Sequence, residues 1–189
     1  MIRDLIIRNR SCRRFDEGFV IERRTLEELA DLARLSASAA NLQPLKYILS
    51  CEPQKNALIF QYVAWAAYLK DWGGPAPGER PSAYLIILGD TAISHSFGCD
   101  HGIAAQSILL GAREKGLAGC MIGLIKREEL SQALLIPTQY EILLVIALGK
   151  PREQVLIDEL GPNGDIKYWR DGAGVHHVPK RSLKEVIIG

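Results

Sequence analysis

The sequence predicts a single domain over residues 1–189 that combines α-helices with a β-sheet, on three observations. The length suits one domain with a sizeable core, and 48% of the residues are hydrophobic against 24% charged, as in ordinary globular proteins. Two short apolar runs, at 83–88 and 142–148, have the length and composition of buried strands. Around them the apolar residues recur at helical spacing, which favours a sheet flanked by helices.

The two apolar runs are expected to form the centre of the sheet. The first ends at Gly89-Asp90 and the second at Gly149-Lys150-Pro151, residue types that commonly end strands. A further strand is expected at 46–50. Gly119 and Gly123 bracket a short apolar segment, and the absence of side chains at its two ends would let a ligand approach the backbone closely.

Two helices are expected before the sheet. Ile2, Leu5 and Ile6 recur at helical spacing and predict a short helix that delivers the basic residues 8–14 to a loop. Thr25 and Glu28 have the spacing of a capping box, in which each side chain binds the other's backbone N–H, so the second helix is expected to begin there.

Three more helices are expected further along the chain. One, from about 54 to 71, is predicted by four residues at helical spacing: Leu58, Tyr62, Trp65 and Leu69. Residues 100–115 are apolar nearly all round, which predicts a helix at the centre of the fold or at an oligomer interface. A surface helix is expected at 126–134.

The C-terminal part carries less apolar sequence. Asp171-Gly172 predicts a loose hairpin before a strand that contains His176 and His177. Because a strand places successive side chains on opposite faces, we expect no joint role for the two imidazoles. Ser182 with Glu185 predicts a capping box over a final short helix.

Composition excludes several classes of protein. The formal net charge of +1 gives no broad electrostatic surface for nucleic acid. No apolar run approaches the roughly 20 residues of a membrane helix, and the first residues lack the apolar core of a signal peptide. The four cysteines are scattered without a Cys-x-x-Cys pair, so neither a disulfide framework nor a zinc ribbon is indicated. We expect a cytoplasmic protein with reduced thiols.

Common catalytic and metal motifs are missing. The chain has no Walker A sequence, no Gly-x-Gly-x-x-Gly and no Gly-x-Ser-x-Gly, so a P-loop, a Rossmann site and the usual hydrolase elbow are not supported. His95, Cys99 and His101 lie close together, but their spacing matches no common zinc site and a fourth ligand is missing nearby. We therefore expect surface or core histidines and no metal.

Two basic stretches at opposite ends of the chain are the strongest functional signal. Residues 8–14 contain four arginines, and Pro179-Lys180-Arg181-Ser182 lies near the other end. Arginine donors fit phosphate oxygens and lysine adds a point charge, so the two stretches together would match a phosphomonoester dianion. The alternative is a solvated basic surface.

Two other groups of residues have a possible ligand-binding role. Asn41 and Gln43 present amide donors and acceptors in a loop, which suits a ring with mixed polar edges such as a flavin, although ordinary turn chemistry also explains them. An aromatic cluster near one predicted helix serves either core packing or the wall of a substrate pocket: Tyr62, Trp65, Tyr68 and Trp72.

Together, four segments in chain order resemble the FMN-dependent nitroreductase family. Asn9-Arg10-Ser11-Cys12-Arg13-Arg14-Phe15 is similar to the family's Arg-Arg-Ser-x-Arg-x-Phe, and Ala37-Ser38-Ala39-Ala40-Asn41-Leu42-Gln43-Pro44 to its Pro-Ser-x-x-Asn-x-Gln-Pro. Residues 100–123 resemble the long dimer helix and the glycine-bounded segment after it. Pro179-Lys180-Arg181-Ser182-Leu183 resembles the C-terminal phosphate-binding element.

The resemblance implies a role for each matched residue. The ribityl phosphate of FMN would be held by Arg10, Ser11, Arg13, Lys180 and Arg181. The flavin would lie at a homodimer interface and meet three residues of the other subunit: Ser38, Asn41 and Gln43. Ile122 and Gly123 would supply backbone N–H groups near flavin N5. Asn9 stands where many members have arginine, a contact that Arg8 or Arg14 could offset.

The fold and reaction implied by the resemblance are those of a homodimeric α+β flavoprotein with a central, mostly antiparallel sheet. Reducing equivalents would pass from NAD(P)H through FMN to a nitroaromatic or quinone in a ping-pong reaction, with no catalytic acid, base or nucleophile from the protein. The alternative is a flavin-binding protein without NAD(P)H turnover, active in flavin handling or sensing. A small nucleic-acid-binding module is disfavoured by the neutral charge.

Overall fold

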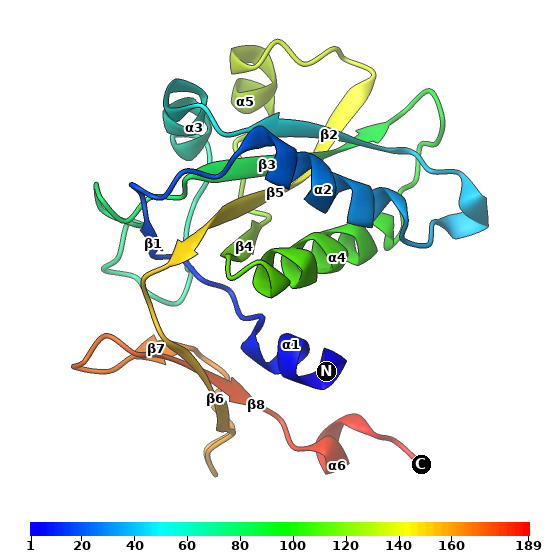
Figure 1. Cartoon of the computed structure of the whole chain (residues 1–189). Helices are drawn as coiled ribbons and strands as arrows, with labels where there is room; N and C mark the ends of the chain where they lie inside the picture. The colour runs from blue at the N-terminus through cyan, green and yellow to red at the C-terminus, as the bar shows by residue number, and fades with distance from the viewer.

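The computed structural model describes residues 1–189 and is built around a five-stranded sheet (Figure 1). Its strands run in the order β1-β5-β3-β2, with β4 also paired to β5, and every pair is antiparallel. The strands are β1 (Phe15–Asp16), β2 (Leu45–Ser50), β3 (Ala83–Asp90), β4 (Ala118–Ile122) and β5 (Tyr140–Pro151). The predicted α+β class and antiparallel sheet are therefore confirmed.

The central strand β3 contributes to two cores, one on each face of the sheet. All eight of its residues are buried. Because successive side chains alternate, Leu85 and Ile87 pack on one face while Tyr84 and Ile86 pack on the other. Burial on both faces explains why this strand reads as a continuous apolar run in the sequence.

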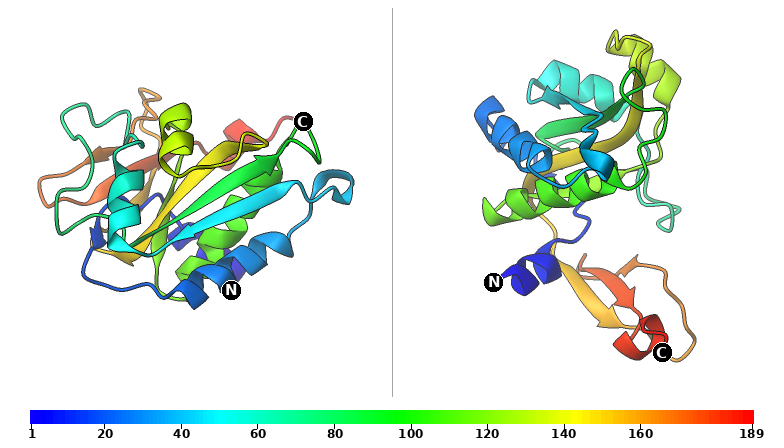
Figure 2. Two further views of the ribbon diagram at one scale, coloured as in Figure 1. Left: turned by 90° about the horizontal axis from the view of Figure 1, so that it is seen from above. Right: turned by 90° about the vertical axis from the view of Figure 1, so that its right-hand side faces the viewer.

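Helices cover both faces of the sheet (Figure 2). On one side lie α2 (Arg23–Arg34) and α4 (Asp100–Glu114), which share a core cluster with Leu85 and Ile87. On the other side lie α3 (Pro53–Phe60), α5 (Arg127–Ala133) and the irregular segment 61–72. Helix α1 (Ile2–Arg8) precedes the sheet and has no buried residue. None of the helices combines the length and apolar character needed to span a bilayer.

The C-terminal residues 155–189 form an arm that extends below the main sheet in Figure 1 and in the right-hand view of Figure 2. The arm contains a small sheet in the order β6-β8-β7, with β6 parallel and β7 antiparallel to β8. Its elements are β6 (Val155–Glu159), β7 (Trp169–Arg170), β8 (His176–Lys180) and α6 (Leu183–Val186).

Several predicted elements are confirmed. The strands at 46–50, 83–88 and 142–148 are present with extra residues at their ends, and the predicted helix at 100–115 corresponds to α4. Helix α4 is buried along one side and partly exposed along the other, so the predicted oligomer interface at this helix stays a prediction. The turn at Asp171-Gly172 joins β7 to β8, and Ser182 with Glu185 forms the expected capping box on α6.

The predicted helix from 54 to 71 is wrong in its second half, since α3 ends at Phe60. Val63 forms a β-bridge with Ile125, and Ala64 N–H donates to Leu124 O at 3.0 Å. Ala66 then adopts a φ of 40°, outside the helical region. Pairing with a distant segment therefore overrides the local helical periodicity.

The predicted capping box at Thr25 is also wrong. Helix α2 begins two residues earlier, at Arg23, and no side chain caps its N-terminus. The Glu28 carboxylate does not fold back toward Thr25; it binds Arg24 Nε at 3.2 Å and Lys115 Nζ at 2.6 Å. Ion pairs with the preceding turn of α2 and with Lys115, just after α4, take the place of the cap.

Candidate functional site

Three of the residues predicted to bind a cofactor line one cavity at the end of β4. This cavity, the β4 cavity, has a volume of about 110 Å³ and includes Arg13, Ile122 and Gly123. Strand β4 positions the latter two, because Ile122 is its last residue and pairs with Val145. Gly123 follows the strand, is exposed, and would place a Cβ in open space.

An irregular stretch of residues 64–67 forms the opposite wall of the β4 cavity. It contributes three alanines and Trp65, whose indole is mostly buried and whose Nε1 has no hydrogen-bond partner. Of the other predicted aromatics, Tyr62 and Trp72 pack against the core, while Tyr68 lies 5.0 Å from Tyr168 of the arm. Trp65 is thus the one member of this aromatic cluster that lines the cavity.

The arginines of the first basic stretch divide into two kinds. Arg8 is paired with Asp4 at 2.7 Å and Arg14 with Glu79 at 3.4 Å. The guanidinium groups of Arg10 and Arg13 form no ion pair with a carboxylate: that of Arg10 donates to Ile6 O at 2.9 Å, and burial lowers the pKa of Arg10 from its ordinary value. Partly desolvated cations without counter-charges are suited to bind an anion.

The Arg13 side chain is held by the arm. It is 9% exposed, its Nη1 lies 3.3 Å from His176 Nε2, and its guanidinium lies 4.8 Å from the centre of the Tyr168 ring. The backbone N–H of Arg13 donates to Glu153, which also accepts from Arg14 N–H at 3.2 Å. The position of Arg13 therefore depends on residues more than 130 places later in the sequence.

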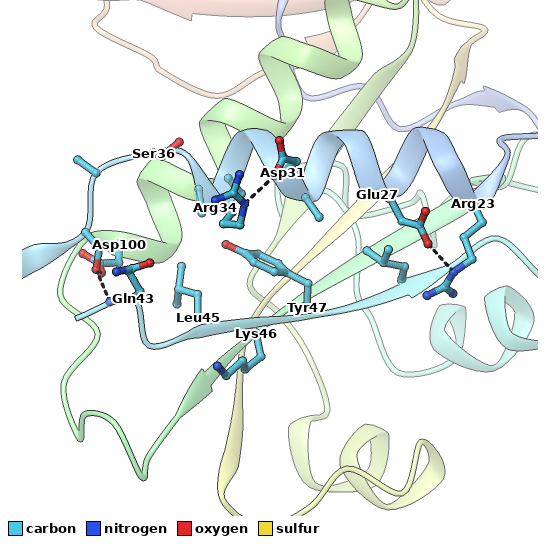
Figure 3. Close-up of a pocket in the computed structure, with 16 residues that line it drawn as sticks. Arg23, Glu27, Asp31, Arg34, Ser36, Gln43, Leu45, Lys46, Tyr47 and Asp100 are labelled. Carbon is cyan, nitrogen blue, oxygen red and sulfur yellow. Dashed lines mark hydrogen bonds and ion pairs between the residues drawn. The ribbon is translucent and has the colours of Figure 1, made fainter. Parts of the chain in front are cut away.

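Two further predicted residues, Ser38 and Gln43, lie elsewhere. They line a cavity of about 560 Å³ between α2 and β2, the α2–β2 cavity (Figure 3). Asn41 lies in the same exposed loop, residues 38–43, which we call the amide loop. Figure 3 shows Tyr47 pointing from β2 toward α2, where burial, and then the charge of Asp100, raises the pKa of Tyr47 to about 12.

Asp100, the first residue of α4, fixes the amide loop. It is 3% exposed, and its carboxylate accepts hydrogen bonds from Ser38 Oγ at 2.6 Å and from Ala39 N–H at 3.1 Å. Ser38 Oγ in turn accepts from Gln43 N–H at 2.9 Å. These bonds stabilise a loop in which three residues other than glycine adopt the left-handed conformation, with φ between 49° and 54°: Ala40, Asn41 and Gln43.

The second basic stretch lies on the arm. Lys180 ends β8 and is exposed, and Arg181 pairs with Glu185 at 3.5 Å. No hydrogen bond or ion pair joins either residue to Arg10, Ser11 or Arg13, and no cavity described above contains both stretches. Both stretches nevertheless lie on the lower side of the molecule in Figure 1, and His176 links the start of β8 to Arg13.

The histidines are separated as expected from a strand. His176 faces Arg13, whereas His177 lies between two carboxylates, with Nδ1 2.8 Å from Asp158 and Nε2 3.4 Å from Asp171. No group of three or more His, Cys, Asp or Glu side chains gathers in an arrangement that could hold a metal ion.

Sequence reasoning missed three residues that organise the site: Asp100, Glu153 and His176. Asp100 had one available signal, since an acidic residue opens a predicted helix, where it is favourable. His176 had a signal in the strand alternation, which placed one of the two histidines inward. Glu153 gave none, because its role rests on contacts with Arg13 and Arg14, far away in the sequence.

Comparison with solved structures shows the same fold in nitroreductases. Nitroreductase A from Vibrio parahaemolyticus is 22% identical, with a TM-score of 0.67 over 85% of this chain and 72% of that one. An FMN-dependent nitroreductase from Clostridium difficile is 21% identical, with a TM-score of 0.65 over 82% and 89%. A protein from Staphylococcus epidermidis named as an NAD(P)H:FMN oxidoreductase is 17% identical, with a TM-score of 0.66 over 80% and 87%.

Sequence comparison identifies the family. A search of curated proteins finds no significant match. The sequence profile of the nitroreductase family, however, matches residues 6–71 and 82–150, which include the first basic stretch, the amide loop and β4. Since this match covers well over half of the 189 residues, the chain belongs to the nitroreductase family of oxidoreductases.

Proposed function

We propose that the protein is an FMN-dependent oxidoreductase that transfers reducing equivalents from NAD(P)H to an electron-poor acceptor, a nitroaromatic or a quinone. The observation that carries the proposal is the β4 cavity, where Arg13 meets the end of β4 at Ile122 and Gly123. The names of two similar solved structures, an FMN-dependent nitroreductase and an NAD(P)H:FMN oxidoreductase, support the choice of cofactor and donor.

The cationic residues fit the phosphate of FMN. Arg10 and Arg13 lack carboxylate partners, and burial already lowers the pKa of Arg10, so a bound dianion would offset the desolvation of these groups. Ser11 is exposed beside them and can add a hydroxyl. Lys180 and Arg181 would complete the phosphate site by closure of the arm over the first basic stretch.

The ring of FMN would lie along the end of β4. Ile122 and Gly123 would present backbone N–H groups to it, a role that any side chain allows. Bound FMN would supply the redox chemistry, accepting a hydride from NAD(P)H and passing the reducing equivalents to the acceptor in a ping-pong sequence. The buried Trp65 and Ala66 would exclude water from this side of the site.

The remaining contacts would come from a second copy of the chain. Ser38, Asn41 and Gln43 lie in the amide loop and share no cavity with Arg13, so one chain does not bring the two groups together. In a homodimer the loop of one subunit would meet the β4 cavity of the other. Mixing an Arg13→Met variant with an Asn41→Ala, Gln43→Ala variant tests this arrangement, because mixed dimers would regain one intact site of two.

A spectrum of the purified protein tests the proposal. The protein should be yellow, or take up added FMN. Its flavin absorbance should bleach when NADH or NADPH is added under argon and return when nitrofurazone or menadione follows. Protein that stays colourless with added FMN would refute the proposal.

The alternative is a flavin-binding protein without NAD(P)H turnover. The contacts that support FMN binding, Arg13 together with Ile122 and Gly123, are the same in this alternative, and none of them supports the use of NAD(P)H. A protein that binds FMN but does not bleach with either nucleotide would support it.

A further inference from the structure

Arg13 has two neighbours that no part of the proposed reaction uses, His176 and Tyr168, and both belong to the arm. His176 is the first residue of β8 and is fully buried; Tyr168 directly precedes β7. His176 Nε2 lies 3.3 Å from Arg13 Nη1, and the guanidinium carbon of Arg13 lies over the Tyr168 ring, 4.8 Å from its centre. The two rings also pack against each other at 5.2 Å.

The chemistry of the contact fixes the state of the imidazole. A guanidinium is always a donor, so His176 Nε2 must accept the hydrogen bond and its ring must be neutral. Burial, followed by the nearby positive charge of Arg13, lowers the pKa of His176 to about 4, which keeps the ring neutral at pH 7. Three other titratable groups nearby act on its pKa: Glu153 raises it, and Arg170 and His177 lower it.

A neutral acceptor orients the Arg13 guanidinium without compensating its positive charge, which a carboxylate would do. A carboxylate at this place would orient Arg13 and also compensate its positive charge, as Glu79 does for Arg14. An imidazole fixes the direction of the guanidinium while the charge stays available to an anion. The aromatic face of Tyr168 likewise orients a cation without neutralising it.

We propose that His176 and Tyr168 are positioning residues that hold the Arg13 guanidinium for the phosphate of FMN, and so couple docking of the arm to cofactor binding. This inference rests on the proposed function. Lys180 lies at the other end of β8 from His176, so the same docking also sets where the second basic stretch is presented. Tyr168 and His176 lie outside residues 6–71 and 82–150, which the family profile matches.

The test compares FMN with riboflavin, which has the same ring system and no phosphate. Both ligands are titrated into apo protein, with quenching of flavin fluorescence as the signal, in the wild type and in three variants. His176→Leu removes the acceptor, His176→Gln retains one, and His177→Gln is the matched control, because its side chain contacts Asp158 and Asp171 instead of Arg13.

We expect His176→Leu to weaken FMN binding about tenfold or more, the usual effect of losing a hydrogen bond to a charged group. Riboflavin binding should stay unchanged, His176→Gln should restore most of the FMN affinity, and His177→Gln should bind FMN like the wild type. In an Arg13→Met background, His176→Leu should have no further effect on FMN.

Equal losses for FMN and riboflavin, or an unchanged FMN affinity in His176→Leu, would overturn the inference. A loss of FMN affinity in His177→Gln as large as that in His176→Leu would overturn it as well, since general loosening of the arm would then explain both. Should His176→Leu not fold by circular dichroism, Tyr168→Leu replaces it with the same expected outcomes. A wild type that binds neither flavin contradicts the proposed function itself, a result distinct from all of these.

Discussion

Replacing Asp100 by alanine should release the amide loop. The carboxylate holds Ser38 and Ala39 through two hydrogen bonds, at 2.6 and 3.1 Å, and is itself 3% exposed. Each hydrogen bond to a charged group contributes about 1.5–3 kcal/mol when buried. The three left-handed residues of the loop cost about 1 kcal/mol each, so the two bonds roughly balance the strain.

We therefore expect Asp100→Ala to lower the free energy of unfolding by about 2–3 kcal/mol, less than the full sum because water can reach the exposed loop. Asp100→Asn keeps one acceptor and should lose about half as much. Urea denaturation measures the global effect. Hydrogen exchange of the amides of Ala39 and Gln43, both bonded in the wild type, measures the loop directly.

The loop prediction also reaches the proposed function. A loop that samples many conformations must be ordered again by the ligand, so FMN binding should weaken in Asp100→Ala. Slow exchange at both amides, together with an unchanged unfolding free energy in Asp100→Ala, would refute the reasoning. That result would mean that the backbone of the loop holds its shape without the carboxylate.

Three other predictions concern the rest of the fold. Gly119→Ala should lower the free energy of unfolding by about 1–3 kcal/mol in urea, because its Cβ would lie 2.5 Å from the backbone O of Ala147; unchanged stability would contradict this. Leu85 is fully buried, so Leu85→Ala should lower the free energy of unfolding by about 2–5 kcal/mol, whereas Leu135→Ala, an exposed control, should lower it by less than about 0.5 kcal/mol. Burial alone would lower the pKa of His177, but its two carboxylate partners outweigh burial and raise the pKa above 6.5. The protonated imidazole therefore stabilises the folded state, so the wild type should exceed His177→Gln in free energy of unfolding most below pH 6.5 and lose that advantage as the pH rises.

The parts of the fold that could be predicted are those in which one local pattern decides the structure. Strands β3 and β5 are buried on both faces, so their apolar runs are visible without knowledge of their partners. The capping box of Ser182 is closed within four residues and is present as expected. The helix expected beyond Phe60 failed because Val63 pairs with Ile125, a contact that no local pattern announces.

The candidate site shows the same division. Its residues could be selected from short motifs, but their surroundings could not. Arg8 and Arg14 looked as available for an anion as Arg10 and Arg13 did, and the structure separates them through Asp4 and Glu79, which neutralise the first pair. Of these two carboxylates, Glu79 lies far from the motif in the sequence and is brought to it only by the fold.

Glu153 has a consequence for how the protein is made. Its carboxylate binds the backbone of Arg13 across 140 residues of sequence, and Glu153 itself lies in the connection between β5 and the arm. During synthesis the N-terminal segment leaves the ribosome 140 residues before its anchor. Such distant contacts close late in folding, so a nascent chain would become able to bind its cofactor only after Glu153 has emerged and reached Arg13.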